Sequence, residues 1–257
     1  IYRDISMKTP VHYVSVNHIR PVRLPFFVDL SRPEDVLNNT WNFYLNTEED
    51  ISVGVWHTLP VGQYEENDGR EPGWHQETLG DGHPVVIYLH GNVGTRWNII
   101  SIFISFFQIL SAAGYHVFSL DYRGFGDSSG EPSESGLTTD ALFLYHWVKR
   151  HSRACLVCLW GHSLGSGSFY TFLPGFQGLL WNILEQNNIV FTLTSPLMIL
   201  HSEDDGVVPH HMGLKTRRRL NTSAEVKMIS FSARHGYSHN NVYLDLNANF
   251  IKFLTFQ

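Results

Sequence analysis

Runs of apolar residues recur along the chain from about residue 85, and most are continuous rather than alternating with polar residues. Continuous apolarity is typical of strands that are buried on both faces of a parallel sheet. The stretches between the runs have helical patterns, so strands and helices alternate, which predicts an α/β fold with helices on both faces of a mostly parallel sheet. The predicted strands are Val85–Leu89, His116–Leu120, Cys155–Trp160, Pro196–His201 and Glu225–Phe231, and the predicted helices are residues 133–151, 210–220 and 240–256.

The first third of the chain has a different pattern. Trp41–Leu45 and Ile51–Trp56 flank an acidic turn, which predicts an antiparallel hairpin. Residues 62–83 are rich in Gly, Glu, Asp and Asn, and they predict an exposed loop. Residues 1–38 contain four prolines and show no clear periodicity before Val36. We therefore expect an extended arm over 1–38 and a single α/β domain over 39–257.

A serine stands at the end of one predicted strand, in the pentapeptide Gly161-His162-Ser163-Leu164-Gly165. Small residues two positions before and after such a serine are typical of a nucleophile elbow, a tight turn that holds the hydroxyl clear of the backbone. Glycine at both positions lets the strand and the following helix pass closely, because it has no Cβ. Ser163 is therefore a candidate nucleophile.

Three further strand ends carry chemical groups: His90-Gly91-Asn92, Asp205 and His239. Functional groups gather at the carboxyl ends of strands in open α/β sheets, and the order Ser, Asp, His is that of α/β-hydrolases. His239 is the predicted general base and Asp205 the group that orients it. The backbone amides of Asn92 and Leu164 are the predicted oxyanion donors.

Neighbouring residues compete for two of these roles. Glu203 and Asp204 precede Asp205, and we favour Asp205 because the turn Asp-Gly-Val-Val-Pro begins there. His235 competes with His239, and two histidines four residues apart could also bind a metal ion. No third ligand is evident for such a site, so the sequence predicts neither a metal nor another cofactor.

Composition limits the class of protein. The chain has 257 residues, 43% of them hydrophobic, and a net charge of −6, which argues against a nucleic-acid partner. It contains no run of 18 apolar residues and no recognisable signal peptide, so no membrane-spanning or targeting segment is predicted within it. Cys155 and Cys158 are interpreted as buried thiols of a strand. Sequons at Asn38 and Asn221 are consistent with a lumenal or extracellular setting.

Six motifs that span most of the chain belong together: Pro25–Leu30, Val53–Thr58, Tyr88–Asn92, Asp121–Ser128, Trp160–Gly165 and Ile199–Asp205. In combination they resemble one branch of the α/β-hydrolase fold, the family of abhydrolase domain-containing protein 12, and its B-type members most closely. This family contains lysophosphatidylserine and monoacylglycerol lipases, so the resemblance implies a serine hydrolase that cleaves lipid acyl esters with a Ser163/Asp205/His239 triad.

The resemblance also implies a location. Members of this family are membrane-anchored glycoproteins whose catalytic domain faces the lumen of the endoplasmic reticulum, and this chain would begin after the anchor helix. The sequon at Asn38 suits that placement. Membrane association is therefore expected to depend on a segment that this chain does not contain.

The chain departs from the family pattern between Ser163 and Asp205, where only residues 164–204 intervene. One βαβ unit takes about 30 residues, so a core strand and a helix, about 35 residues in all, are predicted to be missing. The remaining stretch, about 168–194, resembles a short cap. Ile189–Leu193 lies too close to Leu197 to supply the missing strand through a parallel crossover.

The sequence therefore predicts a serine esterase that acts on monoacylglycerols or lysophospholipids through an acyl-enzyme on Ser163. Two alternatives remain open. The first is a catalytically impaired domain that acts as a binding or regulatory module, because the missing segment would expose sheet edges and displace Ser163. The second is an acyltransferase, in which the same acyl-enzyme passes its acyl group to an alcohol.

Overall fold

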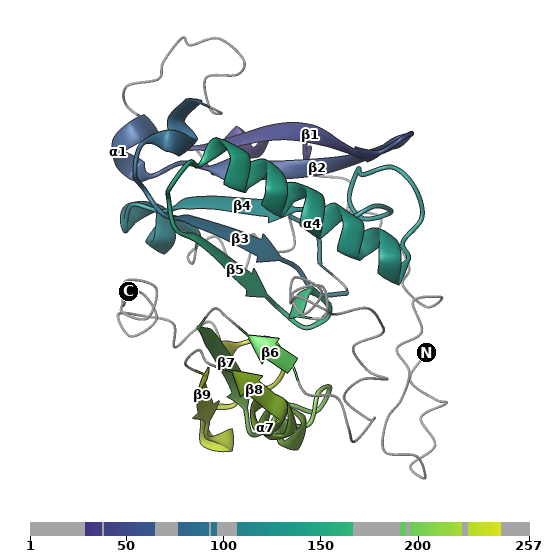
Figure 1. Cartoon of the computed structure of the whole chain (residues 1–257), viewed down its shortest axis with the longest axis vertical. Coiled ribbons are helices and arrows are strands. Elements are labelled where there is room, and N and C mark those ends of the chain that lie inside the picture. The colour runs from purple at the N-terminus through teal and green to yellow at the C-terminus, as the bar shows by residue number, and fades with distance from the viewer. Residues whose placement is uncertain are drawn as a thin grey trace.

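The chain forms a five-stranded sheet and a smaller group of strands beyond one of its edges (Figure 1). The computed structural model describes residues 29–37, 39–64, 77–92, 94–96, 107–166, 191–193, 196–222 and 226–242. No helix among these residues is both long and apolar enough to cross a bilayer.

The five-stranded sheet has the order β1-β2-β4-β3-β5. The predicted antiparallel hairpin is confirmed, because β1 pairs antiparallel with β2, which in turn pairs antiparallel with β4. The predicted parallel part is confirmed as well, because β3 pairs in parallel with β4 on one side and with β5 on the other. The strands are β1 (Thr40–Glu48), β2 (Ile51–Thr58), β3 (Val85–Leu89), β4 (His116–Leu120) and β5 (Val157–Gly161).

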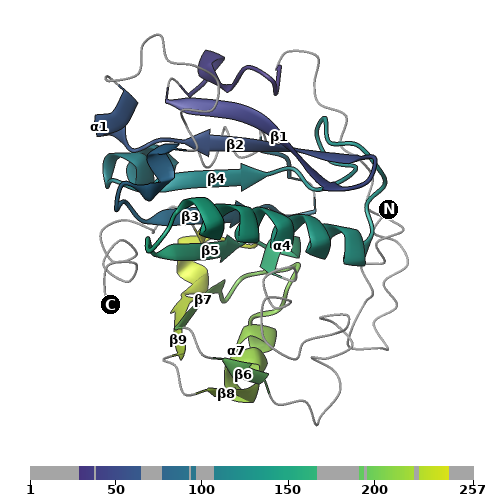
Figure 2. The same ribbon diagram turned by 45° about the horizontal axis from the view of Figure 1, so that its top comes forward.

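Alternate residues of the central strands supply two separate cores. Val85, Ile87 and Leu89 of β3 face a cluster that includes apolar residues of α4 (Glu134–His151), and Figure 2 shows this helix lying across the sheet. Val86 and Tyr88 face the opposite cluster, which includes Phe107 and Leu110 from the helical residues 107–112. Helices therefore cover both faces, as the sequence predicts. Ser133 caps the start of α4, because its hydroxyl accepts a hydrogen bond from the Gly136 amide.

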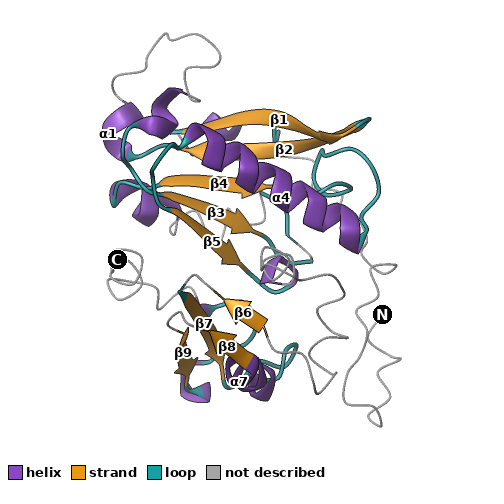
Figure 3. Ribbon diagram, viewed as in Figure 1, coloured by secondary structure: helices purple, strands orange, loops and turns teal. Residues whose placement is uncertain are grey.

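Two short parallel pairs lie beyond β5 (Figure 3). β7 (Leu197–Ser202) pairs with β9 (Val226–Phe231), and both strands were predicted from the sequence. The helix α7 (His210–Arg219) lies between them along the chain. β6 (Phe191–Leu193) pairs with β8 (Leu220–Thr222) rather than with β5, so it does not replace the core strand that the sequence predicts to be missing.

The sheet is interrupted at β5, which pairs only with β3 among the described residues. All five residues of β5 are half-buried, whereas all residues of β3 and β4 are fully buried. β7 and β9, which a continuous sheet would bury, also carry several half-buried residues. The break follows the nucleophile strand, the position at which the shortened stretch between Ser163 and Asp205 predicts a missing strand.

Two sequence predictions are wrong in detail. The loop predicted to be exposed over 62–83 contains η3 (Thr78–Gly80), whose Leu79 is fully buried against the α4 core. Its beginning forms α1 (Val61–Tyr64). Cys155 is buried just before β5, but Cys158 within β5 is only half-buried, because that strand lies at an edge.

Several predictions fall largely outside the described residues. They are the arm over 1–28, most of the cap at about 168–194 and the helix after residue 242. The described end of the arm forms η2 (Pro33–Asp35). Leu30 and Leu37, on either side of it, are buried in the cluster on the face of the sheet opposite α4.

A buried carboxylate ties α4 to the hairpin. Asp140 accepts hydrogen bonds from the Arg123 guanidinium at 2.8, 3.1 and 3.2 Å, from the Arg123 amide at 2.8 Å and from the Thr47 hydroxyl at 2.6 Å. Arg123 also pairs with Glu48 of β1 at 2.9 Å, but the Glu48 side chain is 47% exposed, whereas Asp140 is fully buried.

We expect the two partners of Arg123 to differ sharply in their effect on stability. Asp140→Ala leaves a largely buried guanidinium with the exposed Glu48 as its remaining carboxylate partner and should lower the free energy of unfolding by about 3–5 kcal/mol in urea titrations. Glu48→Ala removes an exposed partner of the same guanidinium and should change stability little. Equal losses in the two variants would contradict this assignment.

Candidate active site

Ser163 sits in a strained turn immediately after β5. Its φ is +53°, in the left-handed region that non-glycine residues rarely adopt. The flanking glycines permit this turn: a Cβ on Gly161 would lie 2.5 Å from the carbonyl oxygen of Gly165, and a Cβ on Gly165 would lie 2.0 Å from that of Leu89. The turn is therefore the predicted elbow, and its glycines are required by close backbone approach.

The structure brings the three predicted triad residues together. The Ser163 hydroxyl donates a hydrogen bond to Nε2 of His239 at 2.9 Å. Nδ1 of the same imidazole donates to Oδ2 of Asp205, also at 2.9 Å. The chain of contacts runs from hydroxyl to imidazole to carboxylate, with both ring nitrogens of His239 in use.

The three acidic residues that follow β7 form hydrogen bonds with different groups. Asp205 bonds His239, whereas Asp204 accepts hydrogen bonds from the Ser202 hydroxyl and the Ser238 amide. Glu203 accepts a bond from the Ala233 amide at 3.3 Å. Of the three carboxylates, Asp205 is the one that contacts His239, and it stays the predicted member of the triad.

The competing histidine, His235, lies elsewhere. It ends η4 (Ala233–His235), is exposed, and stacks on Tyr237 with ring centroids 5.0 Å apart. His239 follows Ser238, whose φ is +50°, so a strained residue directs the imidazole back toward Ser163. Asp204 holds the amide of that strained residue at 3.0 Å.

Asp205 is held in its ionised form. Burial raises the pKa of this carboxyl, but hydrogen bonds from His201 and His239 and from the amides of Val208 and Val207 outweigh burial and hold the pKa well below its usual range. An ionised carboxylate at this position accepts the Nδ1 proton of His239 and fixes the orientation of the ring.

Sequence reasoning missed His201, which lies in β7 beside the triad. Its Nε2 is 2.8 Å from the carbonyl oxygen of Val208 and 3.5 Å from Oδ2 of Asp205. Burial lowers the pKa of His201, but Asp205 and Val208 raise it by more. A histidine four residues before the acid, at the end of the same strand, is the signal that could have indicated this contact.

The loop after β3 approaches the elbow from the other side. A Cβ on Gly91 would lie 3.3 Å from Cβ of Ser163 and 3.1 Å from Nδ1 of His162. Among the described residues, neither the Asn92 amide nor the Leu164 amide donates a hydrogen bond.

A buried arginine fixes this loop. Arg96 is fully buried and pairs with Asp121 at 3.1 Å and with Asp127 at 2.8 Å, both in the turn after β4. Its guanidinium also lies 5.9 Å from the Trp56 ring and 5.7 Å from the Tyr44 ring. Planar stacking and several donors suit arginine to such a position, so Arg96 joins the loop after β3 to the turn after β4 and to the hairpin.

Comparison with known proteins agrees with this architecture. Residues 84–173 match the family model described as the alpha/beta hydrolase fold. The chain is 37% identical to lysophosphatidylserine lipase ABHD12 of Danio rerio over 273 residues, which cover 86% of this chain and 71% of the relative. It is also 37% identical to protein ABHD12B of Homo sapiens over 267 residues, with 85% and 73% covered. The chain belongs to the ABHD12 family of α/β-hydrolases.

Solved structures extend the likeness of this ABHD12-family chain at the level of the fold. The Pyrococcus furiosus esterase Pf2001 superposes with a TM-score of 0.64 at 15% identity, over 91% of this chain and 96% of the esterase. Est1E of Butyrivibrio proteoclasticus, solved with ferulic acid, gives a TM-score of 0.59 at 16% identity, over 84% of this chain and 100% of Est1E. The family assignment thus rests on sequence, and the fold is shared with more distant esterases.

We expect Asp204→Ala to slow catalysis in this ABHD12-family chain without unfolding it. Removing the acceptor of the Ser238 amide frees the strained residue before His239, and a displacement of about 1 Å there should lower kcat by roughly 10- to 100-fold. Short-chain ester hydrolysis and thermal unfolding should be measured on the same samples.

Glu203→Ala is the matched control for this variant. It removes the neighbouring carboxylate, which holds the Ala233 amide rather than Ser238, and should leave kcat within about twofold of the unsubstituted protein. An unchanged kcat in Asp204→Ala, or equal losses in the two variants, would refute the positioning role of Asp204.

Proposed function

We propose that this chain is a serine hydrolase that cleaves acyl esters of lipids such as lysophospholipids or monoacylglycerols. The observation that carries the proposal is the unbroken contact from Ser163 through His239 to Asp205, with 2.9 Å at each hydrogen bond. Relatives at 37% identity that carry the name lysophosphatidylserine lipase support the lipid part of the proposal.

In the first half of the reaction, the Ser163 hydroxyl attacks the carbonyl carbon of the ester. Nε2 of His239 takes the hydroxyl proton, a contribution of roughly 10²–10⁴-fold in rate. The ionised Asp205 fixes the Nδ1–H tautomer and stabilises the imidazolium. His239 then returns the proton to the departing alcohol oxygen, and the acyl group remains bonded to Ser163 Oγ.

The carbonyl oxygen becomes negatively charged in the tetrahedral intermediate and needs donors. The amides of Asn92 and Leu164 are the proposed pair, since one follows Gly91 beside Ser163 and the other follows Ser163 itself. One such donor contributes roughly 10²–10³-fold in rate. Arg96 sets the position of the Asn92 loop through its pairs with Asp121 and Asp127.

In the second half, water attacks the acyl carbon while His239 accepts a proton from it. The bond from the acyl carbon to Ser163 Oγ breaks, the proton returns to that oxygen, and a fatty acid is released. An alcohol in place of water would complete acyl transfer instead, so the two outcomes share every residue named above.

Loss of Ser163 tests the proposal directly. Ser163→Ala should abolish labelling by a fluorophosphonate probe and reduce hydrolysis of monooleoylglycerol and lysophosphatidylserine by at least about 10³-fold. Ser135→Ala, which removes an exposed hydroxyl of α4, is the matched control and should retain both activities. Product analysis with an added alcohol acceptor separates hydrolysis from transfer.

The alternative of a catalytically impaired domain predicts that the folded protein does not hydrolyse esters. It is motivated by the interrupted sheet at β5, but the elbow and the triad contacts are intact across that interruption. Stable, monodisperse protein that binds lipid yet turns over neither lipid esters nor short acyl esters would favour this alternative over the hydrolase.

We also propose that the full-length protein places this domain on the lumenal side of the endoplasmic reticulum membrane, anchored by a segment outside this chain. The sequons at Asn38 and Asn221 and the lipid substrates of the named relatives support this location. In transfected cells, endoglycosidase H should increase the gel mobility of the full-length protein, and the double variant Asn38→Gln/Asn221→Gln should lose that shift. An unglycosylated protein that is degraded by protease added outside sealed microsomes would reject the lumenal location.

A further inference from the structure

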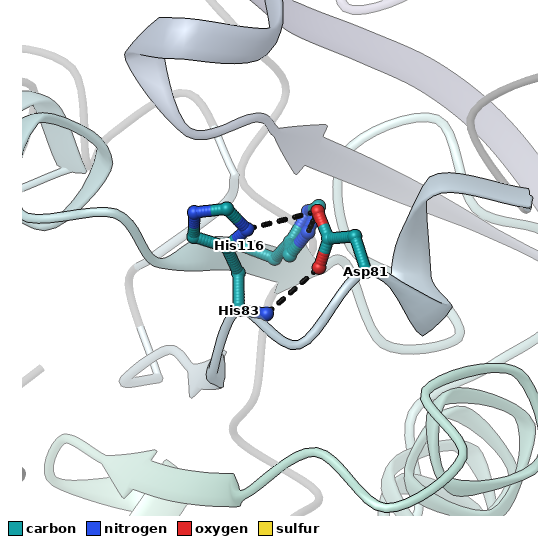
Figure 4. A group of neighbouring side chains, drawn as sticks. All are labelled: Asp81, His83 and His116. Carbon is teal, nitrogen blue, oxygen red and sulfur yellow. Dashed lines mark hydrogen bonds and ion pairs between the residues drawn. The ribbon is translucent and has the colours of Figure 1, made fainter.

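Two histidines and an aspartate converge at the amino ends of β3 and β4. Asp81 and His83 lie in the turn that leads into β3, and His116 is the first residue of β4 (Figure 4). This end of the parallel strands is opposite to the end that carries Ser163. The cluster is therefore separate from the proposed triad.

The carboxylate of Asp81 is the centre of the cluster. Oδ2 of Asp81 lies 3.0 Å from Nδ1 of His83 and 3.3 Å from Nε2 of His116, while Oδ1 accepts the His83 amide at 2.8 Å. One oxygen thus meets two imidazole nitrogens and also accepts a hydrogen bond from the Gln63 side-chain amide. The three candidate ligand atoms all lie within 4.8 Å of one another.

These separations suit a tetrahedral metal ion. With bonds of about 2.0–2.1 Å from zinc to nitrogen or oxygen, neighbouring ligand atoms are about 3.3–3.4 Å apart. The distances from Oδ2 of Asp81 to the nitrogens of His83 and His116, 3.0 and 3.3 Å, are close to that value. The third separation, between the two imidazole nitrogens, is within 4.8 Å, and the His83 side chain is 44% exposed.

His57 supports the cluster from behind. Its Nε2 lies 2.9 Å from Nδ1 of His116, and both residues are fully buried. Hydrogen bonding of the second ring nitrogen is the usual way in which a protein orients a histidine ligand. When a metal occupies Nε2, the His116 proton moves to Nδ1 and is donated to His57.

The cluster is also reachable from solvent. It borders a surface hollow lined by Asp81, Gly82, His83, Pro84, Ala113, Gly114 and Tyr115. Side-chain exposure increases from the buried His116 through Asp81 to His83, which lies nearest to solvent. Water can therefore occupy a fourth coordination position.

We propose that Asp81, His83 and His116 bind one Zn²⁺ ion, which fastens the turn before β3 to the start of β4. Two imidazoles and one carboxylate favour a first-row transition ion such as Zn²⁺ over Mg²⁺ or Ca²⁺, which prefer oxygen ligands. Three protein ligands and one water complete four-coordination. The role is structural, because the site lies at the far end of the strands from Ser163.

Equilibrium dialysis against ZnCl₂ tests the proposal, with purified protein that carries no polyhistidine tag. We expect one equivalent of Zn²⁺ by elemental analysis, retained in excess Mg²⁺, and a rise of about 5 °C in the thermal midpoint at saturation. Co²⁺ should give the intense visible absorption of four-coordinate geometry in place of the weak bands of the hydrated ion.

Variants locate the ion. His83→Ala and Asp81→Asn should each weaken Zn²⁺ binding at least about tenfold and remove the thermal shift. His146→Ala, which removes an exposed histidine of α4, should bind as the unsubstituted protein does. Less than a stoichiometric amount of zinc at saturation, or unchanged binding by His83→Ala, would overturn the proposal. Because none of these readouts uses ester hydrolysis, the result is independent of the proposed function.

Discussion

The hydrogen bond between Ser163 and His239 joins two parts of the structure whose described strands share no backbone hydrogen bonds. Ser163 follows β5, the last strand of the five-stranded sheet, whereas His239 and Asp205 follow β9 and β7 of a separate pair. In a continuous parallel sheet, an intervening strand would fix the spacing of these strand ends through backbone hydrogen bonds. Here the spacing depends on side chains, so the candidate chemistry rests on the packing between the two parts.

Two kinds of contact maintain that packing. Met198 and Leu200 of β7 lie against the same apolar cluster as Cys158 and Trp160 of β5. Close to the triad, Nε2 of His162 donates to the carbonyl oxygen of His239 at 3.3 Å, so the elbow holds the backbone of the base as well as its ring. Apolar burial holds the two parts together but does not fix their relative orientation, because it is non-directional. The hydrogen bonds of His239 have a defined geometry and fix that orientation.

The sequence was sufficient for features that depend on local pattern. Continuous apolarity located β3 and β4, and the two glycines around Ser163 predicted the elbow because their spacing reflects backbone contacts within a single turn. The choice of Asp205 over Asp204 depended on which carboxylate faces His239 in space. The turn Asp-Gly-Val-Val-Pro favoured Asp205, and in the structure the amides of Val207 and Val208 hold Asp205 within that turn.

The features that the sequence did not reveal join residues that are distant along the chain. Arg96 reaches Asp121 and Asp127 in the turn after β4, and the sequence around Arg96 gave no sign of a fully buried guanidinium. The turn around Asp81 looked like an exposed loop because its composition is polar, yet Leu79 within it is buried and directs Asp81 toward His116. Polar composition reports the average exposure of a segment and says little about one apolar side chain that anchors it.

Stability and catalysis therefore depend on different parts of this molecule. The two apolar cores and the buried Asp140–Arg123 pair lie within or against the five-stranded sheet, which carries most of the fully buried apolar residues. The triad spans the junction, where all residues of β5 and several residues of β7 and β9 are half-buried. Regions with few buried contacts open at lower free energy than the whole domain unfolds. Loosening at the junction would thus separate Ser163 from His239 while the five-stranded sheet stays folded. The packing of β7 against β5 therefore determines how closely Ser163 and His239 are held together.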